Sequence, residues 1–358
     1  MNRREFLGCA AASAALAATA AGTAASKPAA KPRKARPEGF AWGILLHFGM
    51  NFWGEWDGEA AGAAPEDQFV KGDRAKALSA LAKEKGPQRH LRFDYETWKA
   101  ATEHMAKRGL NMALIDMGEA VVLPRRPELA ASDSWSVERF RKELDRLRSL
   151  GLEPIPKFNF SACHDAWLKD YGHMMGDRKY YEVVADVIRD TVEIFDTPRF
   201  FHIGYEEEFG NKYERPDDLW WHDLGFIVGE VERLGVRAWA WTDYPAWRPR
   251  ETFARKMPKS VLQSAWWYAE MKDLITCRDP RMFAKAGLFA DLERMGFDQI
   301  PCGGNYCTDK NMAEIVRCGD AVVRDGRLKG YLTTTWRATL PDYRKAIFDA
   351  VDQLGDLI

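Results

Sequence analysis

Short apolar runs alternate with longer stretches in which apolar residues recur at helical spacing, from Phe40 to the end of the chain. A short apolar run predicts a strand buried on both faces, and helical spacing predicts an amphipathic helix. Eight strands are expected, at 43–48, 111–116, 152–158, 200–205, 237–241, 261–266, 299–303 and 330–335. Helices are expected at 94–107, 136–149, 180–195, 217–234, 281–295, 310–324 and 342–354.

This alternation predicts a parallel sheet, because parallel neighbours need a crossover connection such as a helix. Eight βα units suit a (β/α)8 TIM barrel. An open doubly wound sheet is the alternative, but the Gly-rich phosphate turn that usually follows its first strand is absent. Several predicted helices end at a glycine just before the next strand, which suits a left-handed C-cap. We therefore predict an α/β protein in which residues 38–358 form one (β/α)8 catalytic barrel.

One long insertion interrupts this pattern. Residues 54–91 separate the first strand from its helix and are rich in Ala, Gly, Lys and Glu. A loop of this length in a compact domain is usually a lid or a binding loop. A poorly ordered insertion fits the composition equally well, so both interpretations stay open.

The amino terminus resembles an export signal. Arg3 and Arg4 precede an Ala-rich run of small residues to about residue 25, which is typical of a twin-arginine signal peptide. Residues 26–37, rich in Lys, Pro and Ala, predict a basic linker. The Ala-rich run is too weakly apolar for a membrane span, so no stable membrane insertion is expected after cleavage. We expect the twin-arginine export machinery to deliver the mature protein to the periplasm or the cell exterior.

Charge and cysteine content exclude several classes of protein. The chain has 52 Lys and Arg against 53 Asp and Glu, and its first 37 residues hold seven bases and one acid. The rest therefore has a net charge of −7, which argues against a nucleic-acid-binding surface. The cysteines after residue 25 match no zinc-ligand spacing, although Cys302 and Cys307 are near enough in sequence to pair. We expect no metal and no cofactor.

Polar side chains gather after the predicted strands, at the end of the barrel where active sites lie. Strand four is followed by three consecutive carboxylates, Glu206, Glu207 and Glu208. Such neighbours repel one another unless solvent, cations or raised pKa values relieve the repulsion. The run is therefore either a solvated acidic loop or a chemical site. Other polar residues at strand ends are His47, Asp116, Glu119, Asn159, His164, Asp243, Asn305 and Tyr306.

The tryptophans favour the chemical site. Nine of the 14 fall at or beyond a predicted strand end, whereas core-filling tryptophans would favour strand interiors and the inner faces of helices. They are Trp53, Trp56, Trp135, Trp167, Trp241, Trp247, Trp266, Trp267 and Trp336. An indole ring offers a flat apolar face and an N–H donor, which suit the C–H faces and hydroxyls of a sugar. Carboxylates among such rings indicate a carbohydrate substrate.

Two segments resemble the glycoside hydrolase family 20 β-N-acetylhexosaminidases. Residues 202–207 read His-Ile-Gly-Tyr-Glu-Glu, which is similar to the family's His-Ile-Gly-Gly-Asp-Glu at the end of strand four. Residues 152–159, followed by His164, are similar to the family's strand-three segment. The order of aromatic residues extends the resemblance over roughly residues 150–340. Glu206 differs from the family because it replaces the shorter Asp.

The resemblance implies a glycosidase whose substrate supplies the nucleophile. Glu207 would be the general acid, while Glu206 and Tyr306 would hold the 2-acetamido group whose oxygen attacks the anomeric carbon. The absence of an acidic residue at 299–306 fits this chemistry. The residues expected to contact the substrate are His47, Asn159, His164, Trp241, Asp243, Trp266, Trp267, Asn305 and Trp336.

A second resemblance concerns the first strand. Residues 43–49, followed by 93–98, are similar to the opening of the family 29 α-L-fucosidases, in which the strand-one histidine contacts the sugar. This resemblance implies an α-L-fucosidase or another exo-glycosidase, with Glu206 or Glu207 as a carboxylate nucleophile and His47 on the sugar.

Two other classes of function remain open. Asp116, Glu119, His164, Glu206 and Asp243 include the ligand types of a divalent cation, as in a metal-dependent sugar isomerase or epimerase. A non-catalytic barrel that only binds carbohydrate would keep the aromatic mouth without turnover.

Overall fold

The computed structural model describes residues 35–53, 69–83, 86–209, 214–275, 277, 279–324 and 326–358. The expected signal peptide at 1–25, most of the expected linker at 26–37 and the first part of the insertion lie outside this set, as does Trp56.

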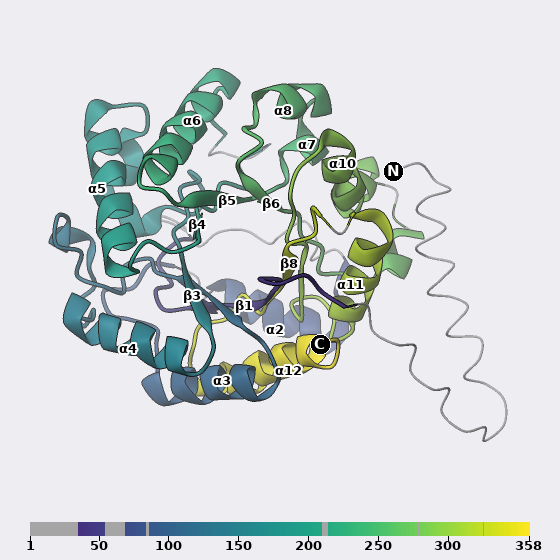
Figure 1. Ribbon diagram of the computed structural model, residues 1–358, viewed down its shortest axis with the longest axis horizontal. Helices are drawn as coiled ribbons and strands as arrows, with labels where there is room; N and C mark the ends of the chain where they lie inside the picture. The colour runs from purple at the N-terminus through teal and green to yellow at the C-terminus, as the bar shows by residue number, and fades with distance from the viewer. Residues whose placement is uncertain are drawn as a thin grey trace.

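Eight parallel strands form the centre of the molecule, with helices packed around them (Figure 1). Their order is β6-β5-β4-β3-β2-β1-β8-β7. Isolated bridges link Gln263 with Gln299 and Trp266 with Cys302, which brings the two ends of this order together. The fold is therefore the nearly closed (β/α)8 barrel that the sequence predicts.

The strands are β1 (Ala41–His47), β2 (Met112–Asp116), β3 (Glu153–Lys157), β4 (Phe200–His202), β5 (Arg237–Trp241), β6 (Leu262–Ser264), β7 (Cys302–Gly304) and β8 (Gly330–Thr334). The helices are α2 (Gly72–Lys83), α3 (Tyr95–Lys107), α4 (Val137–Ser149), α5 (Arg178–Ile194), α6 (Asp217–Arg233), α7 (Tyr244–Trp247), α8 (Arg250–Lys256), α9 (Pro280–Ala286), α10 (Leu288–Met295), α11 (Asn311–Val322) and α12 (Arg344–Gly355).

Burial on both faces explains why the strands read as unbroken apolar runs. Every residue of β1, β2 and β8 is buried. One face of each strand points into the barrel and the other meets the surrounding helices, so neither face needs polar residues.

Local signals define the helix ends. The side chain of Asp94 accepts a hydrogen bond from the Thr97 backbone N–H at the start of α3, and Ser136 accepts one from Arg139 at the start of α4. Gly151 follows α4 with a φ of +77°, a conformation that glycine adopts without steric cost. The chain can therefore turn directly from each helix into the next strand.

The structure differs from the sequence-based expectation in two regions. The helix expected at 281–295 is two helices, α9 and α10, which meet at Gly287. Glycine is a poor helix former, so the break lies there. The insertion contains helix α2, and Asn51 exchanges two hydrogen bonds with the backbone of Gln88, at 2.7 and 2.8 Å, across the base of the insertion.

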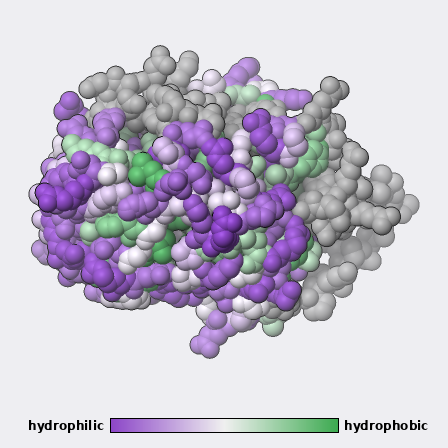
Figure 2. Space-filling model, turned by 90° about the horizontal axis from the view of Figure 1, so that it is seen from above, coloured by the Kyte–Doolittle hydropathy of each residue, from purple (hydrophilic) through white to green (hydrophobic). Residues whose placement is uncertain are grey.

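The described surface is mainly hydrophilic, with small separate apolar areas on the face shown in Figure 2. Val122 and Met174 are the large hydrophobic side chains exposed on the part of the chain that the structure describes. No helix in that part is long and apolar enough to cross a membrane. Cys302, which the sequence left as a potential partner of Cys307, is a free thiol, so the two do not form a disulfide.

Candidate active site

The segment after β4 has an unusual backbone. Gly204, Tyr205 and Glu207 have φ values of +67°, +79° and +63°. A Cβ atom on Gly204 would lie 2.2 Å from Oδ1 of Asn159, so only glycine fits there. A left-handed conformation at a non-glycine residue costs about 1–3 kcal/mol, and such strain concentrates at functional sites. These turns send neighbouring side chains in different directions.

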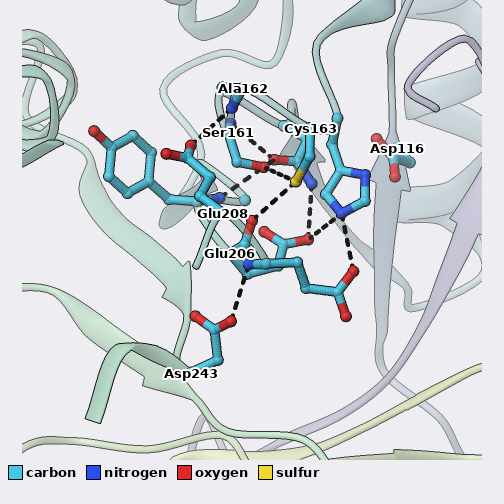
Figure 3. A network of polar contacts seen from close by, with 12 residues as sticks. Asp116, Ser161, Ala162, Cys163, Glu206, Glu208 and Asp243 are labelled. Atoms are coloured by element: carbon cyan, nitrogen blue, oxygen red, sulfur yellow. Dashed lines mark hydrogen bonds and ion pairs between the residues drawn. The ribbon is translucent and has the colours of Figure 1, made fainter. Parts of the chain in front are cut away.

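The three consecutive carboxylates accordingly have different surroundings. The carboxylate of Glu208 is fully buried, accepts a hydrogen bond from the Ala162 backbone N–H at 2.7 Å and forms an ion pair with Arg215. Arg215 also pairs with Asp223 at 2.7 Å. In Figure 3, Glu208 extends towards Ala162, while Asp243 lies on the other side of the segment. Glu208 therefore ties the loop after β4 to the loop after β3 and does not line the pocket.

Glu206 is buried against the loop after β3. Its Oε1 atom accepts a hydrogen bond from Nδ2 of Asn159 at 2.8 Å and lies 3.9 Å from Nε2 of His164. Its Oε2 atom is buried and has no hydrogen-bond partner among the described residues. Burial raises the pKa of Glu206 to about 7, although the charges of His164 and Lys157 act in the opposite direction.

Glu207 is the accessible member of the acidic run. Its side chain is 32% exposed, and its Oε2 atom lies 3.1 Å from Nε2 of His164. Burial would lower the pKa of His164, but Cys163 and the carboxylates of Glu207 and Glu206 outweigh it and raise that pKa well above its usual value. One imidazole therefore contacts both carboxylates, and its charge acts to lower the pKa of Glu206.

Aromatic rings enclose the two carboxylates in a pocket of about 520 Å3 that is open to solvent. Trp241 lies 5.8 Å from Trp266 and 5.9 Å from Trp336 between ring centroids, so these three indoles form a continuous wall. The full lining is Phe52, Trp53, Asn159, His164, Glu206, Glu207, Trp241, Trp266, Tyr268, Tyr306 and Trp336.

Eight of the twelve residues that the sequence singled out line this pocket: Asn159, His164, Glu206, Glu207, Trp241, Trp266, Tyr306 and Trp336. They come from the loops after β3, β4, β5, β6, β7 and β8. The structure thus brings together residues up to about 180 positions apart in the chain, as expected where parallel strand ends converge.

His47 lies beneath the pocket rather than in its lining. It is 1% exposed, and its Nδ1 atom is 3.4 Å from Oδ2 of Asp116, which also binds Nζ of Lys157 at 2.7 Å. Burial lowers the pKa of His47. Burial alone would raise the pKa of Asp116, but Lys157 and His47 lower it overall. The ring of His47 instead supports Phe52, with centroids 5.2 Å apart.

The other three predicted residues also lie outside the lining. Trp267 is fully buried and packs edge-on against Phe69, with ring centroids 5.6 Å apart. Nδ2 of Asn305 donates a hydrogen bond to the Ala346 carbonyl at 2.7 Å. Asp243 is buried behind Glu207 and accepts a hydrogen bond from its backbone N–H. Each side chain follows a strand end but turns away from the pocket.

Phe52, Trp53 and Tyr268 also line the pocket, although none of them was among the expected substrate contacts and only Trp53 was counted among the tryptophans at strand ends. Phe52 and Trp53 are placed by Glu119, whose two carboxylate oxygens accept the Met50 and Asn51 backbone N–H groups at 3.0 Å each. The sequence signal for these pocket residues was that two aromatic residues, Phe52 and Trp53, stand together shortly after the first strand. Their direction depends on this buried carboxylate, which sequence spacing does not reveal.

The five residues considered for a cation site do not form one cluster. Asp116 is paired with Lys157, and Glu119 is occupied by backbone N–H groups. Within the described ranges, no group of three or more His, Cys, Asp and Glu side chains is arranged to hold a metal ion. The carboxylates near the pocket therefore serve as separate hydrogen-bonding groups.

The sequence matches no protein-family model and no curated protein. Solved structures share its fold. A family 20 exo-β-N-acetylglucosaminidase from Vibrio harveyi is 13% identical with a TM-score of 0.56, over 88% of this chain and 54% of that one. A family 20 β-N-acetylhexosaminidase from Streptomyces coelicolor A3(2) is 12% identical with a TM-score of 0.56, over 88% and 64%.

Dispersin B is 14% identical with a TM-score of 0.53, over 75% of this chain and 96% of its own. The chain thus spans about half to two thirds of the length of the Vibrio and Streptomyces enzymes. At this level of identity the comparison concerns architecture. The chain has a (β/α)8 barrel fold similar to that of the family 20 β-N-acetylhexosaminidases.

Proposed function

We propose that the protein is a glycoside hydrolase that removes a terminal 2-acetamido sugar by substrate-assisted, retaining hydrolysis. The observation that carries the proposal is the pair of unlike carboxyl groups in an aromatic pocket. Glu207 is accessible, whereas Glu206 is buried with one oxygen atom unpartnered, and both contact His164. No other carboxylate lines the pocket among the described residues.

In this proposal Glu207 is the general acid. Its carboxyl group donates a proton to the glycosidic oxygen as the bond from that oxygen to the anomeric carbon breaks. The acetamido oxygen forms the new bond to the anomeric carbon, giving a cyclic intermediate. Glu207 then takes a proton from water, whose oxygen opens the ring from the face that the leaving group occupied. Two displacements retain the anomeric configuration.

Glu206 orients the acetamido group. Oε2 of Glu206 is the buried acceptor available to an acetamido N–H, while Asn159 holds Oε1. Positive charge develops on the acetamido group as its oxygen attacks, and an ionised Glu206 stabilises that charge. Tyr306, on the wall contributed by the loop after β7, is the hydroxyl that we assign to the acetamido oxygen. Trp241, Trp266 and Trp336 supply apolar faces for the sugar ring.

The surroundings of the pocket favour attack by the acetamido oxygen of the substrate over attack by a carboxylate of the protein. A retaining enzyme with a protein nucleophile places its two carboxyl groups on either side of the scissile bond. Here both carboxylates follow the same strand, and the facing walls are aromatic. The sugar contact that the fucosidase resemblance assigns to His47 is not available, because His47 lies beneath Phe52.

Hydrolysis by the Glu207→Gln variant tests the proposal. The wild type should release 4-nitrophenol from its β-N-acetylglucosaminide and cleave chitobiose, but should not act on the matching β-glucoside. Glu207→Gln should lower kcat by about 100- to 10,000-fold on chitobiose. The loss on the nitrophenyl substrate should be smaller, because nitrophenolate leaves without a full proton.

Asp190→Asn is the matched control, since Asp190 is a buried carboxylate on α5 outside the pocket. It should keep both activities. Equal activity of Glu207→Gln and wild type on chitobiose would remove Glu207 as the acid. Turnover of the glucoside at the same rate as the acetamido sugar would remove substrate assistance.

We also propose that the protein is exported by the twin-arginine route. Arg3 and Arg4 before the Ala-rich run support this proposal. Replacement of both arginines by lysine should retain the full-length chain in the cytoplasmic fraction. Equal export of the two forms would contradict the proposal.

A further inference from the structure

The general-acid residue of the proposed function has a strained backbone. Glu207 has a φ of +63°, in the left-handed region that side chains with a Cβ atom rarely adopt. Such a conformation persists where surrounding contacts hold it. The relevant contact is therefore one made to the Glu207 main chain rather than to its carboxylate.

Asp243 makes that contact. Its Oδ2 atom accepts a hydrogen bond from the Glu207 backbone N–H at 2.9 Å, and the dashed line in Figure 3 joins the two groups. Asp243 follows β5 directly and is 2% exposed. Its position is fixed locally, because its carbonyl accepts the Ala246 N–H at 2.8 Å in the short helix α7. A residue of the segment after β5 thus contacts the backbone of a residue of the segment after β4.

The carboxyl group of Asp243 is buried without a full set of hydrogen-bond partners among the described residues. Its Oδ1 atom is buried without a hydrogen-bond partner among the described residues. Burial, aided by the charges of Glu207 and Glu206, raises the pKa of Asp243 to about 8, although the hydrogen bond from the Glu207 N–H and the charge of Lys285 act in the opposite direction. The positive charge of Lys285 on α9 and the negative charges of the loop after β4 are the charges that face this carboxyl group.

We propose that Asp243 is a positioning residue that holds Glu207 in its left-handed conformation and so aims the acid at the glycosidic oxygen. The sequence suggested a substrate contact for Asp243, whereas the geometry points to an effect exerted through Glu207. This inference rests on the proposed function for its catalytic consequence. Its structural part, the restraint on the Glu207 main chain, is independent of any substrate.

The proposal distinguishes two variants that remove the same carboxyl group. Asp243→Asn keeps an oxygen acceptor at the same reach, so the Glu207 N–H keeps its hydrogen bond. Asp243→Ala removes the acceptor and frees φ of Glu207 to relax. A displacement of about 1 Å in a reacting group lowers the rate by about 100-fold. We therefore expect kcat to fall about 100-fold in Asp243→Ala with KM little changed, and to recover most of that loss in Asp243→Asn.

The experiment measures kcat and KM with chitobiose, whose leaving group needs the proton from Glu207, and amide hydrogen exchange of the peptide containing Glu207. Asp190→Ala is the matched control, because Asp190 is equally buried and accepts a loop N–H, that of Arg125, at 2.8 Å far from the pocket. Exchange at Glu207 should accelerate in Asp243→Ala alone. If Asp243→Ala does not fold, Asp243→Ser, which reaches less far, replaces it.

The outcomes separate the two proposals. Unchanged kcat and unchanged exchange in Asp243→Ala would overturn the positioning role. A loss of kcat in Asp243→Asn equal to that in Asp243→Ala would also overturn it, because the carboxyl group itself rather than the oxygen acceptor would then matter. If the wild type hydrolyses no 2-acetamido sugar, the proposed function fails. The exchange of the Glu207 amide still decides whether Asp243 restrains it.

Discussion

At the residue scale, the surroundings of Glu206 set the pH range in which its carboxyl group is ionised. A carboxyl group in water would be ionised near pH 7, but burial raises the pKa of Glu206 to about 7. The hydrogen bond from Asn159 and the charges of His164 and Lys157 limit this rise. The group therefore changes charge within the working range of most enzymes. In the proposed mechanism, its ionised form is the one that stabilises a positively charged acetamido group.

This environment predicts an acidic limb in the pH profile. Because the ionised form of Glu206 is required, kcat/KM should fall as the pH drops below about 7. Asn159→Ala removes a hydrogen bond that lowers the pKa of Glu206, so the acidic limb should move to higher pH. Steady-state rates between pH 5 and about 9 measure the shift.

The control for this profile is Asn305→Ala. Asn305 is also a buried amide after a strand, but it bonds to the Ala346 carbonyl rather than to Glu206. The acidic limb in the pH profile of Asn305→Ala should coincide with that of the wild type. An acidic limb that is the same in Asn159→Ala as in the wild type would assign the ionisation to another group.

Sequence spacing predicted that Glu206, Glu207 and Glu208 follow strand four, but not how their directions differ. Their directions depend on the left-handed turns at Gly204, Tyr205 and Glu207 and on the buried Arg215 that captures Glu208. Only at Gly204 does the residue type itself hint at such a turn. The family resemblance suggested roles for Glu206 and Glu207, but the different surroundings of the three adjacent acids needed coordinates.

At the element scale, the turn after β4 combines strain with close packing. Gly204 has a φ of +67°, and a Cβ atom there would overlap Oδ1 of Asn159. The same Asn159 holds Glu206, so a clash at Gly204 reaches the pocket directly. The loops after β3 and β4 thus act as one unit.

Gly204→Ala tests this coupling. The variant should lose stability by several kcal/mol, because backbone strain of about 1–3 kcal/mol adds to the displacement of Asn159. Its kcat/KM should fall as Glu206 loses its hydrogen bond. Thermal unfolding and steady-state rates measure the two effects.

Gly235→Ala separates strain from the clash. Gly235 has a φ of +79°, but no atom lies within 4 Å of the position of its Cβ. This variant should show the cost of strain alone, about 1 kcal/mol, with unchanged kcat/KM. Equal effects of the two substitutions on stability and activity would show that the contact with Asn159 is unimportant.

Helices and strands could be predicted from the sequence where their pattern of apolar residues was strong. Strands such as β1 are buried along their whole length, so an apolar run marks them. The helix break at Gly287 and the helix α2 inside the insertion carry weaker signals, because a single glycine is tolerated in many helices and α2 has no strong apolar stripe. Whether such segments form a helix, and where the helix ends, depends on tertiary contacts.

At the scale of the whole molecule, seven of the eight strands contribute residues to one aromatic pocket at their carboxyl ends. Four of the nine tryptophans at or beyond predicted strand ends line it: Trp53, Trp241, Trp266 and Trp336. Trp267 shows the limit of this reasoning, since it follows β6 beside Trp266 yet packs on Phe69 outside the pocket. Neighbouring residues of an extended segment face opposite ways, and spacing alone does not say which one faces inward.

Convergence of the strands predicts that ligand binding stabilises the entire barrel. A ligand that binds only the folded state at about 100 times its Kd adds about 2.7 kcal/mol to the free energy of unfolding. N-acetylglucosamine should therefore raise Tm by several degrees, whereas glucose at the same concentration should not, because it lacks the N–H that Oε2 of Glu206 accepts. Differential scanning fluorimetry compares the two sugars. Equal shifts would mean that the pocket recognises the sugar ring without its acetamido group. In Glu206→Gln the amide side chain presents donors as well as an acceptor, so the advantage of N-acetylglucosamine over glucose should shrink.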